Sequence, residues 1–405
     1  MIISVISDMH LGFSYDERLE EDSYKNFEIA MNKALEDSDL IILAGDLFDS
    51  RAPKTKAWAY ALKILSKATL VENRGVKLVE TDKKLKEASI KTLSHIPIIA
   101  IHGNHEIRAR GETNAIEALE NAGLLIYLDK NYVIFEKDGE KICIYGLSHV
   151  QERLAKEILD KWNPYPRKDM FNILVMHQNI SPFIYSPLEQ PTISLDNLPL
   201  GFDLIIDGHI HTKTLEKINN SIFLIPGSTI ITQFQMEEAE NQKGFYKINT
   251  ITKEVNFIPI ESRKFFYEIF DIKQGENGKE KIERRIREII FKNIQPVIKF
   301  KINGDISEKD LKDLERKYYD SAILIFSKTL ESEELTKKLE FLRNIKEEKL
   351  SLDELGISIL RKCLDEAGFK HSFDFYSIFN LLKDEEVDTA LKIILGEQST
   401  LRMVK

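Results

Sequence analysis

The sequence predicts an α/β fold with a largely parallel central sheet, and two observations support this prediction. The first is a set of short, continuous apolar runs bounded by Gly, Asp or Asn, which are typical of buried strands. These runs cover residues 2–6, 40–43, 96–101, 173–176 and 204–206. The second is the presence of helix-like stretches between the first three runs, such as residues 24–35 and 55–67. Strand, helix and strand at this spacing favour right-handed crossovers and parallel pairing.

Further elements follow the last of these runs. The next strand-like segments, expected to close a second half of the sheet structure, are residues 222–225, 244–248 and 254–258. From residue 263 the pattern predicts a small separate βαβαβ domain with strand 265–272, helix 280–292, strand 297–302, helix 308–318 and strand 322–327. A charged segment, residues 331–349, then predicts a linker. A capping box at residues 351–354 opens a tail helix, and a second helical region covers about residues 375–395.

Composition indicates a globular, cytoplasmic protein. The chain has 405 residues, enough for two or three domains, with 43% hydrophobic and 30% charged residues. No apolar run approaches the roughly 18 residues of a membrane span. The first strand begins at the N-terminus, which leaves no room for a signal peptide. The two cysteines, Cys143 and Cys363, lie in separate regions and favour a reducing compartment over a disulfide framework.

Polar side chains follow each of the five apolar runs directly. They lie in Asp8-Met9-His10, Gly45-Asp46, Gly103-Asn104-His105-Glu106, His177 and Gly208-His209-Ile210-His211. Because ligand sites in parallel sheets form outside the carboxyl ends of the strands, distant segments can converge there. Asp, Asn and His supply the oxygen and nitrogen ligands of first-row metal ions. The ordered set therefore indicates a two-metal phosphoesterase.

A simpler interpretation exists for each residue taken alone. Asp8 and Asp46 could be turn or cap residues. A lone buried histidine is more often a core residue than a ligand, and we expect this of the histidines outside the pattern, namely His95, His102, His149 and His371. Five of the nine histidines nevertheless fall in one ordered pattern, which favours the metal site.

The pattern resembles the calcineurin-like metallophosphoesterase superfamily. The segments at residues 7–12 and 45–49 are similar to the nuclease subunit of the double-strand-break repair complex, the meiotic-recombination-eleven/SbcD family. The resemblance implies a β-sandwich flanked by helices over residues 1–262, a small α/β capping domain that binds DNA over 263–330, a charged linker over 331–350 and a helical region over 351–405. It also implies a manganese-dependent DNA nuclease, acting as a 3'-5' exonuclease on duplex ends and an endonuclease on single strands and hairpins.

The resemblance implies a role for each residue of the pattern. The Asp46 carboxylate would bridge two ions roughly 3.5–4 Å apart. The first ion would be held by Asp8, His10 and His211. The second ion would be held by Asn104, His177 and His209. Nitrogen and oxygen ligands without thiolate suit Mn²⁺, with Mg²⁺, Fe²⁺ or Zn²⁺ as alternatives.

One residue of the pattern has a different implied role, two residues depart from the family pattern, and one connection is unusually long. His105 would protonate or stabilise the phosphate or leaving group instead of binding metal. Glu106 stands where Asp is usual and would orient its neighbour. Asp49 stands where relatives often have His, and an anion there would be unfavourable beside a DNA phosphate. Residues 70–93 are longer than the usual connection, and we expect an amphipathic helix over 82–93.

The net charge of −9 is not typical of a nucleic-acid-binding protein, but DNA contact needs only a local basic face. The candidate DNA contacts near the metal rim are Arg51, Lys54, Arg108 and Arg110. Arg284 and Arg285 belong to a second basic group between residues 279 and 301. A solvated helix face is the alternative interpretation for that second group.

Two protein partners are implied. A coiled-coil ABC-type ATPase would bind the apolar stripes of the tail, through Leu355, Ile359, Phe375, Ile378, Phe379 and Leu382. The alternative is that the tail helices pack on the small domain. A second copy of the chain would bind residues 58–62, Ile64, Leu65, Ile116 and Leu119, unless these residues pack into the core of their own chain.

Three functions fit the metal motifs. The first is a DNA nuclease, the second a small-molecule phosphatase or cyclic-nucleotide phosphodiesterase, and the third a non-catalytic scaffold. The extra domain and the tail favour the nuclease, because a minimal phosphodiesterase needs neither. A purple-acid-phosphatase site is disfavoured, since Asp49 occupies the position of its tyrosine ligand.

Overall fold

The first large sheet of the computed structural model contains the first three motif strands. The structure describes residues 1–328 except 86, 109–110, 185–190, 274, 294 and 305, together with residues 377, 378, 381 and 391. In spatial order the sheet consists of β15 (Glu254–Pro259), β14 (Gly244–Asn249), β1 (Ile2–Ile6), β2 (Leu40–Ala44), β4 (Ile98–Ile101) and β5 (Ile126–Tyr127). Four of these strands, β1, β2, β4 and β5, are parallel to one another, as predicted. β14 runs antiparallel beside β1, where Ile2 pairs with Asn249.

The second large sheet carries the other two motif strands. Its strands, in order, are β12 (Thr214–Ile218), β13 (Ser221–Ile225), β11 (Leu204–Asp207), β8 (Phe171–Met176), β7 (Glu140–Leu147), β6 (Asn131–Lys137) and β3 (Lys77–Thr81). Two short strands, β9 (Ile180–Ser181) and β10 (Ile193–Ser194), pair with each other. The expectation that residues 244–248 and 254–258 close this second sheet is wrong, because β14 and β15 extend the first one.

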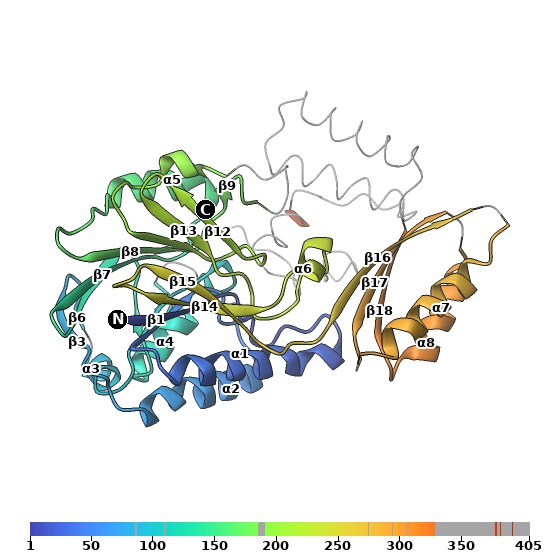
Figure 1. Cartoon of the computed structure of the whole chain (residues 1–405), viewed down its shortest axis with the longest axis horizontal. Helices are drawn as coiled ribbons and strands as arrows, with labels where there is room; N and C mark the ends of the chain where they lie inside the picture. Colours follow the sequence, from blue (N-terminus) through green and yellow to red (C-terminus); the bar gives the residue numbers. More distant parts are fainter. Residues whose placement is uncertain are drawn as a thin grey trace. The chain divides into compact units, whose positions relative to one another are not determined.

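The two sheets pack face to face in a sandwich with helices outside. Alternate residues of one strand explain the layers: Leu40 and Ile42 belong to the core between the sheets, while Ile41 and Leu43 pack against helices. The helices on the outer face of the first sheet are α1 (Glu20–Leu35), α2 (Thr55–Leu65) and α4 (Ala115–Asn121). α5 (Glu152–Trp162) covers the outer face of the second sheet (Figure 1).

The long connection before β4 differs from its prediction. Residues 77–81 form the edge strand β3, which pairs antiparallel with β6. The helix is α3 (Glu87–Leu93), shorter than the expected 82–93. The sequence did not indicate this strand, because charged and polar residues at 80–83 interrupt the apolar pattern. The strand is mostly exposed, which is possible at the edge of a sheet.

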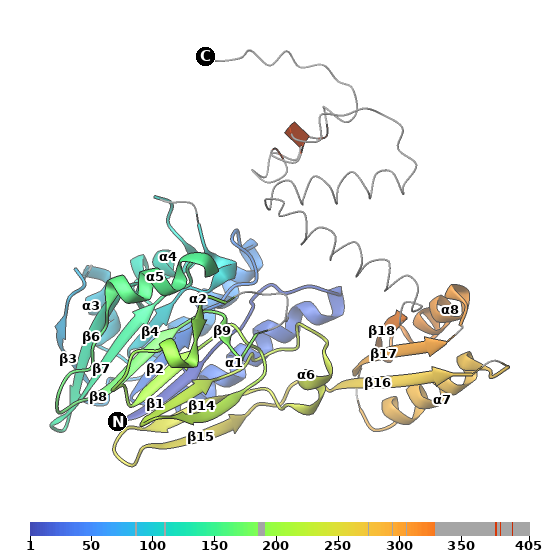
Figure 2. The same cartoon turned by 90° about the horizontal axis from the view of Figure 1, so that it is seen from above.

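The predicted βαβαβ order over residues 265–327 is confirmed. It consists of β16 (Phe265–Ile272), α7 (Gly278–Ile290), β17 (Val297–Gly304), α8 (Glu308–Tyr318) and β18 (Ile323–Lys328). The three strands are parallel and lie side by side (Figure 2). One face packs on α7 and α8 around Phe300. The opposite face contributes Phe265, Val297 and Ile323 to a cluster with Leu19 and Phe234 of the sandwich. We call residues 265–328 the third-sheet module.

Polar contacts join the third-sheet module to the sandwich at α1 and the turn before it. Arg263 binds both carboxylate oxygens of Asp22, and Arg18 donates to the carbonyls of Tyr319 and Ala322. Residues 1–328 therefore form one unit, while residues 329–405 form another. Among the described residues, no helix is both long and apolar enough to cross a lipid bilayer. Of the tail residues named for the ATPase, Ile378 is described and buried, and the others lie outside the described residues.

Candidate metal centre

The predicted ligands lie in turns that directly follow the motif strands, and several of these turns have an unusual backbone. Asp8, His10, Asp46 and His209 have positive φ values of 52°, 46°, 47° and 79°. Such values in residues other than glycine cost about 1–3 kcal/mol each and persist only where the surroundings enforce them. Here the turns hold one another: the N–H of His10 donates to the carbonyl of Asp46 at 3.0 Å, and that of Asp8 to the carbonyl of Gly45 at 3.2 Å.

Three glycines of the pattern make room for ligand side chains. A Cβ on Gly103 would lie 2.0 Å from Oδ1 of Asp46, and one on Gly45 would lie 2.3 Å from Nδ1 of His177. A Cβ on Gly208 would lie 2.5 Å from the same nitrogen. A larger residue at any of these positions would displace a predicted ligand, which explains the glycine before the polar residue in these three motifs.

The first group of predicted ligands, which we call the first ligand group, contains Asp8, His10 and His211. Nε2 of His10 lies 3.0 Å from Nε2 of His211, which lies 3.6 Å from Oδ1 of Asp8. All three side chains are buried. Donor atoms this close, on segments some 200 residues apart in sequence, can converge on a single cation.

The second group contains Asp46, His177, His209 and Asn104. Oδ1 of Asn104 lies 3.2 Å from Nε2 of His177 and 3.0 Å from Nδ1 of His209. Oδ2 of Asp46 lies 3.3 Å from Nε2 of His177 and 3.9 Å from Nε2 of His10. Asp46 therefore stands between the two groups, where a shared carboxylate would be expected.

The outer ring nitrogens of three histidines are held by polar groups. Nδ1 of His10 lies 3.0 Å from Oδ1 of Asp49, and Nδ1 of His177 lies 2.8 Å from the carbonyl of Ala44. Nδ1 of His211 contacts Oγ1 of Thr232. A proton on each Nδ1 leaves Nε2 with a lone pair directed at the site, the usual arrangement of metal-binding histidines.

The electrostatics of the cluster favour a cation. Burial opposes a charge on His177, but the Asp46 and Asp8 carboxylates outweigh it and raise the pKa of His177 to about 10. Burial would raise the pKa of Asp46, yet His177 and His10 lower it. Burial and the charge of His177 lower the pKa of His209 to about 3. A buried pair of carboxylates that retains a proton on a neighbouring imidazole would bind divalent cations, so the donor set fits the metals that the resemblance implies.

His105 stands beside the two groups and is more accessible than they are. Its side chain is 38% exposed, its N–H donates to Oδ1 of Asp46 at 3.0 Å, and its Nδ1 lies 2.9 Å from the carbonyl of Asp49. With Nδ1 as donor to that carbonyl, Nε2 is left for a substrate. The two family departures have defined contacts. Asp49 orients His10, and the buried Glu106 accepts hydrogen bonds from the N–H groups of Phe48 and Gly103, both at 2.9 Å.

Two histidines that we expected in the core differ in their surroundings. His102 is 8% exposed, and a ring nitrogen lies 2.8 Å from the hydroxyl of Tyr127. His149 is half-buried, and its ring stacks 6.4 Å from that of His209. It therefore borders the second ligand group, which the spacing of the sequence does not indicate.

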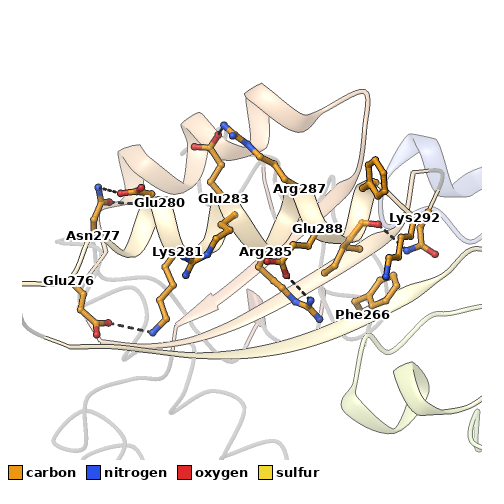
Figure 3. Close-up of a pocket in the computed structure, with 14 residues that line it drawn as sticks. Phe266, Glu276, Asn277, Glu280, Lys281, Glu283, Arg285, Arg287, Glu288 and Lys292 are labelled. Atoms are coloured by element: carbon orange, nitrogen blue, oxygen red, sulfur yellow. Dashed lines mark hydrogen bonds and ion pairs between the residues drawn. The ribbon is translucent and has the colours of Figure 1, made fainter.

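The predicted DNA contacts fall into two sets. Arg51 and Arg108 are exposed, two residues beyond Asp49 and Glu106, while Lys54 caps α2 and Arg110 lies outside the described residues. Arg285 lies on α7 and binds Glu288 at 3.1 Å (Figure 3). It also binds Glu268 of β16 at 2.8 Å.

Other cations of α7 are also partnered, so the helix is less basic than its sequence suggests. Arg287 binds Glu283, and Lys281 lies 3.4 Å from Glu276 (Figure 3). Arg284 is exposed, and within the described part of the chain it has no ion-pair or hydrogen-bond partner.

The residues named for self-association are largely internal. Ile64, Leu65, Ile116 and Leu119 are all at most 1% exposed and belong to the core between the first sheet and its helices. Their assignment to a dimer interface is therefore wrong. From the sequence, these apolar stripes could have packed either on a second copy or on the core of their own chain. In the structure they pack on the core of their own chain. Leu62 is 42% exposed.

Comparison with known proteins gives consistent matches. A profile of the calcineurin-like phosphoesterase family matches residues 1–213. The DNA double-strand break repair protein Mre11 of Methanocaldococcus jannaschii is 31% identical over 73% of this chain and 77% of its own length. The Mre11 protein of Saccharolobus solfataricus is 26% identical over 96% of this chain and 98% of its own. The match to MRE11 of Encephalitozoon cuniculi is 28% identical over 72% of this chain, and spans 53% of that protein.

Proposed function

The chain belongs to the calcineurin-like phosphoesterase family and, within it, to the Mre11 double-strand break repair nucleases, and from this premise we propose that it is a two-metal, manganese-dependent DNA nuclease. It would remove nucleotides from duplex ends in the 3'-5' direction and cut single strands and hairpins. The observation that carries the proposal is the meeting of two ligand groups across the Asp46 carboxylate.

The residues of this chain would hold the ions and fix their environment. Asp8, His10 and His211 would bind one ion, Asn104, His177 and His209 the other, and Asp46 both. When bound, the metal pair supplies Lewis acidity and an activated water near neutral pH. The left-handed turns and their mutual hydrogen bonds keep these donors in place before any substrate arrives.

His105 would act on the substrate itself. Its backbone is tied to Asp46, so the ring is kept next to the metal ligands. Its Nε2 would donate a proton to the leaving oxygen or a hydrogen bond to the phosphate, while the Asp49 carbonyl holds Nδ1. Arg51, Lys54 and Arg108 would bind phosphates of the strand beyond the metals.

One experiment separates this function from its alternatives. The purified chain is incubated with Mn²⁺ and end-labelled duplex, hairpin and single-stranded DNA, beside a chromogenic phosphodiester and a cyclic nucleotide. We expect DNA cleavage that EDTA abolishes and Mn²⁺ restores, with shortening from 3' ends. Turnover of the small substrates alone would identify a small-molecule phosphodiesterase, and no turnover of any substrate would identify a scaffold.

We also propose two partners, by resemblance. The segment 351–405 would bind the coiled-coil ATPase of a repair complex, and the chain would form a homodimer through a surface other than the buried residues named above. Truncation after Lys349 should keep nuclease activity and lose co-purification with the ATPase. A truncated chain that binds the ATPase as before would refute the assignment, and a strict monomer in light scattering would refute the dimer.

A further inference from the structure

A buried ion pair lies behind the first ligand group. Lys243 and Glu238 are each 4% exposed, and Nζ of Lys243 lies 2.8 Å from Oε1 of Glu238. Lys243 also donates to Oγ of Ser228 at 2.7 Å and to the carbonyl of His211 at 3.4 Å. Because a buried ion pair is costly to desolvate and rarely adds net stability, its role calls for another explanation.

The Glu238 carboxylate organises the turn that precedes it. Its Oε2 accepts hydrogen bonds from the N–H groups of Gln233 at 2.8 Å and Phe234 at 2.9 Å, and Oε1 accepts one from Thr232 at 3.4 Å. Phe234 has a φ of 49°, so this turn too is held in a conformation that the chain would not adopt by itself. Glu238 lies in the short helix α6 (Met236–Glu240).

The organised turn reaches the metal ligand. Oγ1 of Thr232 contacts Nδ1 of His211, the nitrogen directed away from the ligand group. His211 is therefore contacted at two points by this turn and its ion pair. Thr232 contacts its ring, and Lys243 donates a hydrogen bond to its carbonyl. The turn is anchored on its other side by Phe234, whose ring lies 5.9 Å from that of Phe265 in β16.

We propose that Thr232, Glu238 and Lys243 are positioning residues of the metal centre, which hold His211 in the orientation that binds the first ion. The proposal rests on the two-metal function proposed above. Thr232 accepts a hydrogen bond from the Nδ1–H of His211 and so directs the Nε2 lone pair at the ion. Glu238 fixes Thr232, and Lys243 neutralises Glu238 and holds the backbone of His211.

The direct test replaces the Thr232 hydroxyl. Thr232→Val keeps the size of the side chain and removes the acceptor, whereas Thr232→Ser keeps the acceptor. Co²⁺ is titrated into each full-length variant, with the visible absorption bands and a competing chelator as readouts. We expect one of two sites to bind roughly 10–100-fold more weakly in Thr232→Val, with altered bands, and Thr232→Ser to restore both. Two unchanged sites with unchanged bands in Thr232→Val would overturn the proposal.

A second variant tests the ion pair and does not depend on the first. Glu238→Gln combined with Lys243→Met removes both charges, so that neither is left buried and unpaired. We expect the same weakened cobalt site, while Glu28→Gln, which removes a surface pair with Lys67, should bind cobalt as the wild type does. Wild-type protein that binds no Co²⁺ would refute the two-metal function itself, and a wild-type cobalt site in the double variant would refute only the positioning role.

Discussion

The metal-centre turns and the outer face of α7 are both rich in charged residues, yet the two regions are built in opposite ways. The turns are mostly buried, and four of the predicted ligands have left-handed backbones. The α7 face has regular helical geometry, and cations such as Arg285 and Arg287 are neutralised by carboxylates within the module. The turns direct buried donor atoms at one region that a cation would fill, while several cations of the helix are paired with carboxylates of the module. Substitutions should therefore be severe in the first region and mild in the second.

The largest effect is expected at Asp46. Asp46→Asn removes the charge of the carboxylate that faces both ligand groups, so it should lose most bound metal and nearly all nuclease activity. The folded chain should remain, because a neutral amide is easier to bury than a carboxylate. Metal analysis and a cleavage assay measure the loss, and two ions at full occupancy would refute the bridging role.

Gly103→Ala should be almost as severe, for a steric reason. The backbone of Gly103 has a φ of −94°, which alanine tolerates, but its Cβ would lie 2.0 Å from Oδ1 of Asp46. We expect loss of most activity and a lower free energy of unfolding by about 1–3 kcal/mol. Gly139→Ala is the control, because no atom lies within 4 Å of its Cβ. It should be fully active, with a cost of about 1 kcal/mol from its φ of 82°. Equal activity losses in the two variants would contradict the steric argument.

His105→Asn separates chemistry from metal binding. Because His105 is partly exposed and is bound through its backbone to Asp46, the variant should keep both ions and the affinity for DNA. Cleavage should slow by roughly 10²–10⁴-fold, the usual contribution of a positioned acid. Single-turnover cleavage with saturating Mn²⁺ measures this rate, and loss of metal would instead make His105 a ligand.

Arg284→Ala should have the smallest effect. If Arg284 binds a DNA phosphate, the slope of log affinity against log salt should decrease by about 0.9, and the free energy of unfolding should change by less than about 0.5 kcal/mol. Arg287→Ala is the matched control, because Arg287 is already paired with Glu283 and should leave the slope closer to that of the wild type. A wild-type slope in Arg284→Ala would remove α7 from the DNA-binding surface.

The convergence of the candidate ligands could be predicted from sequence because each of these residues is local to a strand end. An apolar run followed by Asp8, Asp46 or His177 contains both the element and the ligand, and parallel pairing brings the ends together. The βαβαβ module was predictable for the same reason, since its periodicities are local.

The partners of those ligands could not be predicted in this way. Thr232 contacts His211, which lies 21 residues earlier in the sequence, and Asp49 contacts His10, which lies 39 residues earlier. No spacing rule predicts either contact. The edge strand β3 was missed because its exposed, charged residues do not alternate with apolar ones. The sequence of helix α2 indicated an apolar stripe, but it did not indicate what the stripe packs against. In the structure the stripe packs against the core of its own chain.

The pairing of β1 with β14 has a consequence during synthesis on the ribosome. The strand that carries Asp8 is flanked on one side by β2 but on the other by residues up to Asn249. Translation at about 5–20 residues per second separates the emergence of these two partners by roughly 10–40 s. During that interval one edge of β1 is exposed to unwanted pairing, and the first ligand group lacks His211. The nascent chain is therefore most vulnerable to aggregation before its closing strands appear, and slow codons between positions 50 and 240 would prolong that exposure.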